Sequence, residues 1–137
     1  MRDVGEIAAE LKSFRFDSNA EETLHRLAGE IEQHPEGGKL VGVILSLFER
    51  FPNEDFGMPG PLAHAAEHFY RKGYEDELAV SLTRSPTSLT IWLANRIVNA
   101  KDANFQRFLE LLKQIAERSD LDETLTEDAR SFFELHS

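Results

Sequence analysis

The stretch that decides the fold runs from Phe56 to Asn99 and reads FGMPGPLAHAAEHFYRKGYEDELAVSLTRSPTSLTIWLANRIVN. It begins inside a segment, Pro52 to Pro61, whose Pro and Gly residues are too dense for a helix or a strand. Pro61 suits the first turn of the following helix, because the N–H that a proline lacks has no helical partner there. We therefore expect an irregular loop that leads directly into a helix.

Three helical segments are expected after this loop. Apolar residues at intervals of three and four predict a helix that ends at Gly73 and another that begins at Tyr74. Ser85 and Pro86 are then expected as the N-cap and first residue of a third helix, which carries Trp92. No part of the stretch alternates between apolar and polar residues as a half-buried strand does.

The helical periodicity extends outward to both ends of the chain. A capping-box pattern of Ser18 and Glu21 indicates the start of one helix. The segment that begins at Leu40 is apolar on nearly every side, which is typical of a buried central helix. Further helices are expected over residues 4–16, 18–33, 40–51, 105–116 and 121–133.

Together these elements predict an all-α fold of about eight helices in antiparallel pairs. Pairs begin near Lys39, Tyr74 and Ala103, a spacing within the range of helical-repeat families, roughly 34–47 residues. A short HEAT-like solenoid and an orthogonal helical bundle both fit this pattern. A chain of 137 residues is long enough to bury a core, so we expect a single domain over residues 1–137.

Composition narrows the classes of partner and compartment. The chain has no Cys and a net charge of −10. Nucleic acids and anionic membranes both require a basic surface, so neither is an expected partner, whereas a basic protein is. No apolar run approaches the roughly 20 residues of a membrane span, and the N-terminus has no apolar leader segment. We expect a soluble cytoplasmic protein without disulfides or cofactors.

The one catalytic-looking pattern is His64-Ala65-Ala66-Glu67-His68, which matches the H-x-x-E-H pattern of inverted zinc peptidases. On a helix, His64 and His68 lie one turn apart on the same face and Glu67 lies beside them. Such a site needs a third protein ligand, and the pattern does not supply one. A solvated or partly buried helix face is the preferred interpretation, and a small zinc hydrolase using these residues is the weaker alternative. We expect a protein that is not an enzyme and binds no metal.

The helix that contains Trp92 also carries polar side chains within an apolar run. Trp92 is interpreted as a core residue, because aromatic side chains at helical spacing usually anchor a buried seam. Asn95, Arg96 and Asn99 must reach solvent or find a buried partner. We favour the hypothesis that they hold the Gly/Pro loop, whose irregular backbone leaves carbonyl groups to satisfy, over direct contact with a partner.

Three segments of the chain form a distinctive pattern: Gly57-x-Pro59-Gly60-Pro61-Leu62-x-His64, Leu78-x-x-Ser81-Leu82-x-Arg84-x-Pro86-Thr87 and Thr90-Ile91-Trp92-x-x-Asn95-Arg96-Ile97-x-Asn99. They resemble a family of small, helical bacterial immunity proteins, the antitoxins of polymorphic-toxin and contact-dependent growth inhibition systems. The resemblance covers the middle third to half of the chain.

The resemblance implies a non-enzymatic protein that binds one cognate toxin domain in the cytoplasm and neutralises it. A basic nuclease-type toxin fits the acidic composition, because complementary charge speeds encounter. A helical-repeat adaptor without a toxin partner is the alternative from another class. The expected scaffold residues are Gly57, Pro59, Gly60, Pro61, Trp92, Asn95, Arg96 and Asn99. The expected partner-binding residues are Glu54, Asp55, Glu75, Asp76, Glu77, Asp120, Asp122 and Glu123.

Overall fold

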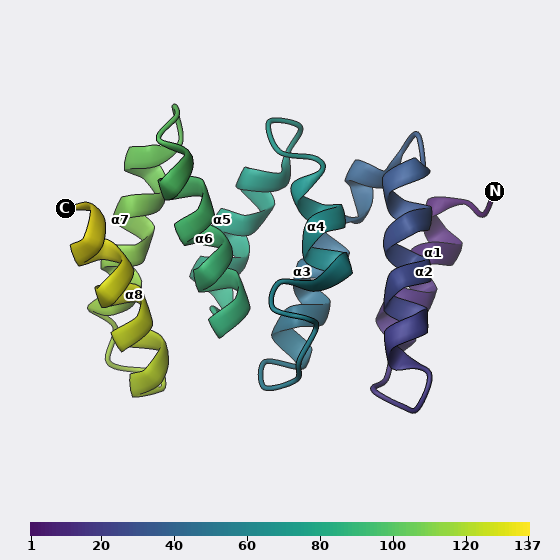
Figure 1. Ribbon diagram of the computed structural model, residues 1–137, viewed down its shortest axis with the longest axis horizontal. Coiled ribbons are helices and arrows are strands. Elements are labelled where there is room, and N and C mark those ends of the chain that lie inside the picture. Colours follow the sequence, from purple (N-terminus) through teal and green to yellow (C-terminus); the bar gives the residue numbers. More distant parts are fainter. The chain divides into compact units, whose positions relative to one another are not determined.

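The computed structural model describes residues 1–137 and is all-α, as predicted, with eight α-helices, one short 3₁₀ helix and no strand (Figure 1). None of the helices combines the length and the apolar character that crossing a bilayer requires. The sequence predicted one domain over residues 1–137. Contacts within the chain gather it into two compact units, Met1–Glu77 and Leu78–Ser137, which are described in turn.

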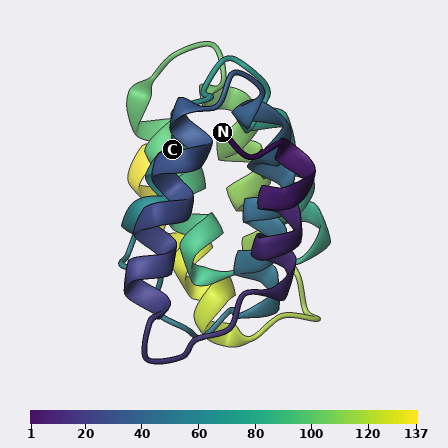
Figure 2. The same cartoon turned by 90° about the vertical axis from the view of Figure 1, so that its right-hand side faces the viewer.

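The first unit consists of two helical hairpins. Successive helices run in opposite directions (Figure 1), with α1 packed on α3 and α2 packed on α4. Figure 2 shows α1 in purple and α2 in dark blue facing the viewer. The elements are α1 (Val4–Ser13), α2 (Ala20–Gln33), the 3₁₀ helix η1 (Gly37–Leu40), α3 (Val41–Arg50), α4 (Gly60–Glu67) and the start of α5 (Tyr74–Arg84).

An aromatic cluster forms one end of the core of this unit. α1 ends at Ser13 rather than near Phe16, and the chain beyond it delivers two phenylalanine rings to the cluster. The ring of Phe56, which is 4% exposed, lies edge-on to Phe48 at 4.8 Å and to Phe16 at 5.0 Å between centroids. Edge-to-face pairs of this kind contribute about 0.5–1.5 kcal/mol beyond their burial. Phe56 thereby ties the beginning of the Gly/Pro loop to α3.

The start of α2 differs from the predicted capping box of Ser18 and Glu21, which is wrong. The helix begins at Ala20 after Asn19, and no side chain caps it. The Oδ1 atom of Asp17 instead accepts the N–H of Asn19 at 2.8 Å, which forms a local Asx turn. The turn places the helix start one residue later than a Ser18 cap would.

The predicted helix end at Gly73 is also wrong, because α4 stops at Glu67. Turns follow, in which Arg71 and Gly73 have φ angles of 68° and 108°. Such left-handed residues cannot continue a right-handed helix. Both carboxylate oxygens of Glu75 accept the N–H of Arg71 at 3.0 Å, so the first turn of α5 holds this reversal in place.

The second unit contains the remainder of α5 together with α6 (Ser88–Ala100), α7 (Phe105–Ala116) and α8 (Glu123–His136). α7 packs on both α6 and α8, and α6 also contacts α8. The predicted start of α6 at Ser85 and Pro86 is wrong. The N-cap is Thr87, whose Oγ1 accepts the Thr90 N–H at 3.1 Å, while the Thr90 Oγ1 accepts the Thr87 N–H at 2.9 Å. Both threonines are buried, so this reciprocal pairing satisfies groups that water cannot reach.

Candidate protein-binding surface

The Gly/Pro loop that carries much of the sequence resemblance has a tightly defined backbone. The Asp55 Oδ1 atom accepts the Gly57 N–H at 2.7 Å, and Gly57 and Gly60 have φ angles of 117° and 86°. A Cβ atom on Gly57 would lie 2.6 Å from the Cα of Gly60, closer than real side chains approach. The loop therefore requires glycine at Gly57 for both its angle and its close contact.

Two hollows open between this loop and α2. One, of about 450 Å³, lies toward the N-terminal end of α2, and the other, of about 590 Å³, extends along the helix to Glu32 and to His64 of α4. His25, Gly57 and Pro61 line both of them. We call the two together the α2–loop groove. Pro61 stands in the first turn of α4, as predicted, and so forms part of the groove wall.

The α2–loop groove has an apolar floor and an acidic rim. Its floor includes the buried side chains of Leu24 and Phe56. Exposed carboxylates stand on its rim, and neither hollow is lined by a Lys or an Arg. A concave surface lined by one sign of charge focuses the field into the hollow. The rim carboxylates belong to Asp17, Glu21, Glu32 and Asp55.

The H-x-x-E-H residues lie on and just beyond α4. The His64 Nδ1 atom is 3.7 Å from Glu67 Oε1, and 58% of the His64 side chain is exposed. His68 is the C-cap of the helix, and its ring packs edge-on against Phe69 with 5.0 Å between centroids. No group of three or more His, Cys, Asp or Glu side chains in the chain is arranged to hold a metal ion. His64 instead contributes to the wall of the α2–loop groove.

The predicted partner-binding acids of the first unit do not share one role. Glu54, Asp55, Asp76 and Glu77 are exposed. Glu75 is only 9% exposed, and both of its carboxylate oxygens accept the N–H of Arg71, which precedes α5 in the chain. Glu75 is thus a structural residue of the helix start, and Asp55 combines a bond to the loop with a place on the groove rim.

The predicted acids of the second unit lie around the start of α8. Asp120 forms an ion pair with Arg118, with 2.6 Å between Oδ2 and Nη2. Asp122 is the N-cap of α8 and accepts the Thr124 N–H at 2.8 Å, and Glu123 stands in the first helical turn. The anionic side chains at this position stabilise the positive end of the helix dipole.

The predicted scaffold residues of α6 have partners within the second unit. The Asn95 Oδ1 atom lies 3.2 Å from His136 Nε2 of α8, and Asn95 is 9% exposed. Trp92 is half-buried, and the guanidinium of Arg96 lies over its ring at 5.1 Å from the centroid. Asn99 is exposed. The hypothesis that these side chains hold the Gly/Pro loop stays a prediction, since the loop belongs to the other unit.

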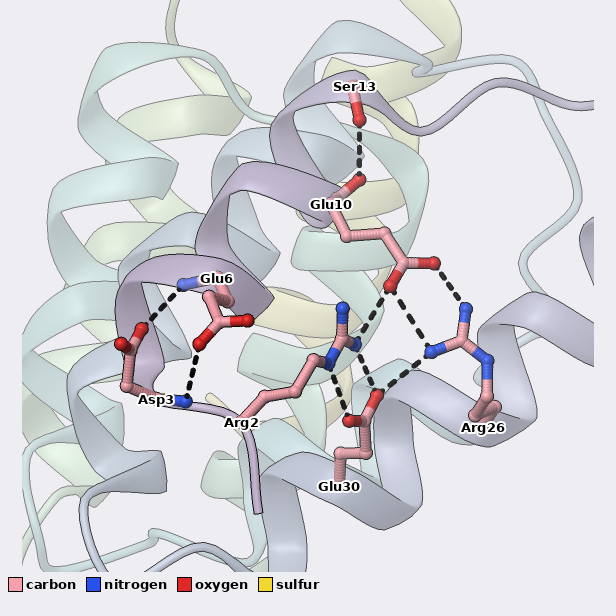
Figure 3. A network of polar contacts seen from close by, with 7 residues as sticks. All are labelled: Arg2, Asp3, Glu6, Glu10, Ser13, Arg26 and Glu30. Carbon is pink, nitrogen blue, oxygen red and sulfur yellow. Dashed lines mark hydrogen bonds and ion pairs between the residues drawn. The ribbon is translucent and has the colours of Figure 1, made fainter.

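An ion-pair network, which sequence reasoning missed, joins α1 to α2 in the first unit (Figure 3). The guanidinium of Arg2 bonds Glu30 through Nε at 2.9 Å and lies 2.8 Å from Glu10 Oε1. Arg26 pairs with the same two carboxylates, and its Nη1 atom lies 2.9 Å from Glu30 Oε2. Only the Arg26 and Glu30 spacing of four residues is visible in the sequence. The network fixes α2, and hence one wall of the groove, to the N-terminal helix.

This network predicts a pH-dependent stability. Hydrogen bonds from Arg26 lower the pKa of Glu10, and hydrogen bonds from Arg2 lower the pKa of Glu30. A carboxyl whose folded pKa lies below its unfolded value, about 4.3, contributes stability above that pH and loses it as the pH falls through the folded pKa. Glu30→Gln is expected to lower the free energy of unfolding by about 1 kcal/mol at pH 7.

Urea unfolding at pH 7 and at pH 3 measures this effect, with the exposed Glu32→Gln on the same helix as the control. The difference between wild type and Glu30→Gln should shrink at pH 3, because that pH lies below the unfolded pKa of about 4.3 and the stabilisation by a lowered pKa is lost as the pH falls. A difference that is equal at both pH values would contradict an ionic origin. An equal loss in Glu32→Gln would show that any acid on α2 has the same effect.

The chain is thus an all-α protein whose first unit carries an acidic groove with a partly apolar floor. Comparison with protein-family models, with curated proteins and with solved structures finds no match to this chain.

Proposed function

We propose that this chain is an immunity protein, a non-enzymatic antitoxin that binds a cognate bacterial toxin domain in the cytoplasm and neutralises it by protein–protein contact. The proposal rests first on the resemblance of the Gly/Pro loop and of the Trp92 to Asn99 helix segment to that family. The observation that carries it furthest is the α2–loop groove, because the loop of the resemblance forms the wall of an acidic hollow with an apolar floor.

The charge of the chain favours a basic partner, such as a nuclease-type toxin domain. The net charge is −10, and Glu54, Asp76 and Glu77 are exposed in the first unit as Glu123 is in the second. Long-range attraction raises the rate of encounter, whereas affinity depends on groups that become buried in the complex. The exposed acids therefore supply steering, and the groove supplies a place where apolar side chains can be buried.

Co-purification from the native host tests the function. Tagged protein expressed at its natural level should recover a basic protein domain at equal stoichiometry, and that domain should be toxic when expressed without the antitoxin. A helical adaptor would instead recover a partner whose expression alone is harmless. Recovery of several unrelated partners at low stoichiometry would contradict the immunity proposal.

Steering by the exposed acids gives a second test once the partner is in hand. The double variant Glu54→Lys and Glu123→Lys is expected to slow association by about tenfold at low salt, with little change in the dissociation rate. The difference should vanish near 1 M salt, where the screening length is about 3 Å. Stopped-flow or surface-based kinetics at several salt concentrations measures both rates.

A matched control separates position from net charge. Glu22→Lys with Glu127→Lys changes the charge by the same amount at exposed positions outside the predicted set. If both double variants slow association equally, only net charge matters and the predicted residues have no special role. Association that depends on neither salt nor charge reversal would show that electrostatic steering is absent.

A further inference from the structure

We propose that the α2–loop groove is a docking site for a short, extended, basic segment of a protein partner, with a Lys or Arg side chain seated against the acidic rim. The inference deepens the proposed function and rests on it for the identity of the partner. The binding chemistry itself depends only on the residues of the groove and can be tested without that partner.

The dimensions of the groove fit a short peptide segment. Its hollows, of about 450 and 590 Å³, lie within the range of binding clefts, roughly 300–1,000 Å³. The rim residues Glu21 and Glu32 lie on the same helix, and a rise of about 1.5 Å per residue separates them by roughly 17 Å along the axis. An extended chain covers that distance with about five residues. The groove is therefore long enough for a segment with alternating side-chain contacts.

The negative charge of the groove favours a ligand of positive charge. Arg26 is the only Lys or Arg in α2, and its guanidinium is held by Glu10 and Glu30 in the ion-pair network. It therefore does not neutralise the rim carboxylates of Asp17, Glu21, Glu32 and Asp55. An anionic ligand would be repelled, whereas a Lys or Arg would gain an attraction that the hollow concentrates.

The apolar part of the groove favours a segment of a protein over a free cation. Leu24 and Phe56 are each 4% exposed and form a floor on which the stem of a Lys or Arg, or a neighbouring aliphatic side chain, can be buried. Met58 lies between Gly57 and Pro59 in the chain and is 53% exposed, although it lines neither hollow. Its flexible apolar side chain is available to a segment that extends beyond the groove along the loop.

The probe for this site is a capped hexapeptide, Lys-Ala-Lys-Leu-Lys-Ala, with the matching Glu-Ala-Glu-Leu-Glu-Ala peptide as the charge control. Titration of the ¹⁵N-labelled full chain should give saturable chemical-shift changes at groove residues such as Leu24, His25 and Gly57. The acidic peptide should give none. Shift changes of equal size at Asp120 and Glu123 of the second unit, or none at the groove, would overturn the proposal.

Charge reversal on α2 provides the decisive comparison. Glu21→Lys is expected to weaken binding of the basic peptide by about fivefold, a size typical of one exposed ion pair. Glu22→Lys makes the same charge change in the same helical turn, but Glu22 does not line either hollow, so a loss of less than about twofold is expected. Equal losses in the two variants would reduce the effect to bulk charge and overturn the site.

A third variant guards against a folding artefact. Glu32→Lys places a cation near the C-terminal end of α2, where the helix dipole favours it, so the fold should be kept. Glu32→Lys should nevertheless weaken binding of the basic peptide, because Glu32 lines the second hollow. If the peptide binds the groove but no toxin co-purifies, the immunity proposal fails and the docking site stands. If a toxin co-purifies and Glu21→Lys leaves its affinity unchanged, the docking site fails and the immunity proposal stands.

Discussion

Gly37→Ala is expected to destabilise the first unit by about 3 kcal/mol or more. Gly37 is buried at the start of η1, and a Cβ atom there would lie 2.1 Å from the carbonyl oxygen of Ile31 and 2.9 Å from the Phe69 ring. The Ile31 carbonyl is part of the end of α2, where it accepts the His34 N–H at 3.2 Å. The backbone of Gly37 and the backbone of Ile31 cannot separate without breaking the turn that joins the two hairpins.

Gly29→Ala is the control for this prediction. Gly29 lies inside α2, and a Cβ atom there meets nothing within 4 Å. Alanine in a helix interior is expected to stabilise by about 0.5–1 kcal/mol relative to glycine. Urea unfolding midpoints should therefore move in opposite directions for the two glycines. A loss of less than about 1 kcal/mol for Gly37→Ala would mean that η1 can shift without cost.

Phe56→Ala is expected to lower the free energy of unfolding by about 3–5 kcal/mol. Its ring packs on Phe16 and Phe48 and is almost fully buried, so its removal leaves a cavity that the surrounding rings cannot fill by small movements. The same ring is part of the groove floor. Weaker binding of the basic hexapeptide is therefore expected along with the loss of stability.

Two further variants separate packing from loop position. Phe56→Leu keeps most of the apolar volume and should cost less than half as much as Phe56→Ala. Phe51 packs on Phe16 at 5.4 Å in the same cluster but is only half-buried, so Phe51→Ala should also cost less. Chemical unfolding of the three variants ranks them. A Phe51→Ala loss as large as that of Phe56→Ala would show that Phe56 is not the main anchor of the loop.

The groove was only partly predictable from the sequence. The Gly/Pro loop, Pro61 in a first helical turn and His64 on a helix face were all placed by local signals. Nothing local indicates that Glu21 and Glu32 lie on the same rim as Asp55, because that requires α2 and the loop to be packed together. The acids chosen from the sequence were therefore a mixture of exposed side chains, helix caps and, in Glu75, a buried structural residue.

The sequence by itself determined the all-α class and the existence of each helix. In every segment, apolar residues recur at intervals of three and four, so that one face of the helix can be buried. It did not determine where α2 and α6 begin. Several side chains compete for the first free N–H groups, and the burial of Thr87 and Thr90 decided α6 while the Asp17 turn decided α2. The ion pair of Arg2 with Glu30 and the acidic groove join residues distant in the chain. Only the tertiary structure decided them, because contact between such residues depends on which hairpins pack together.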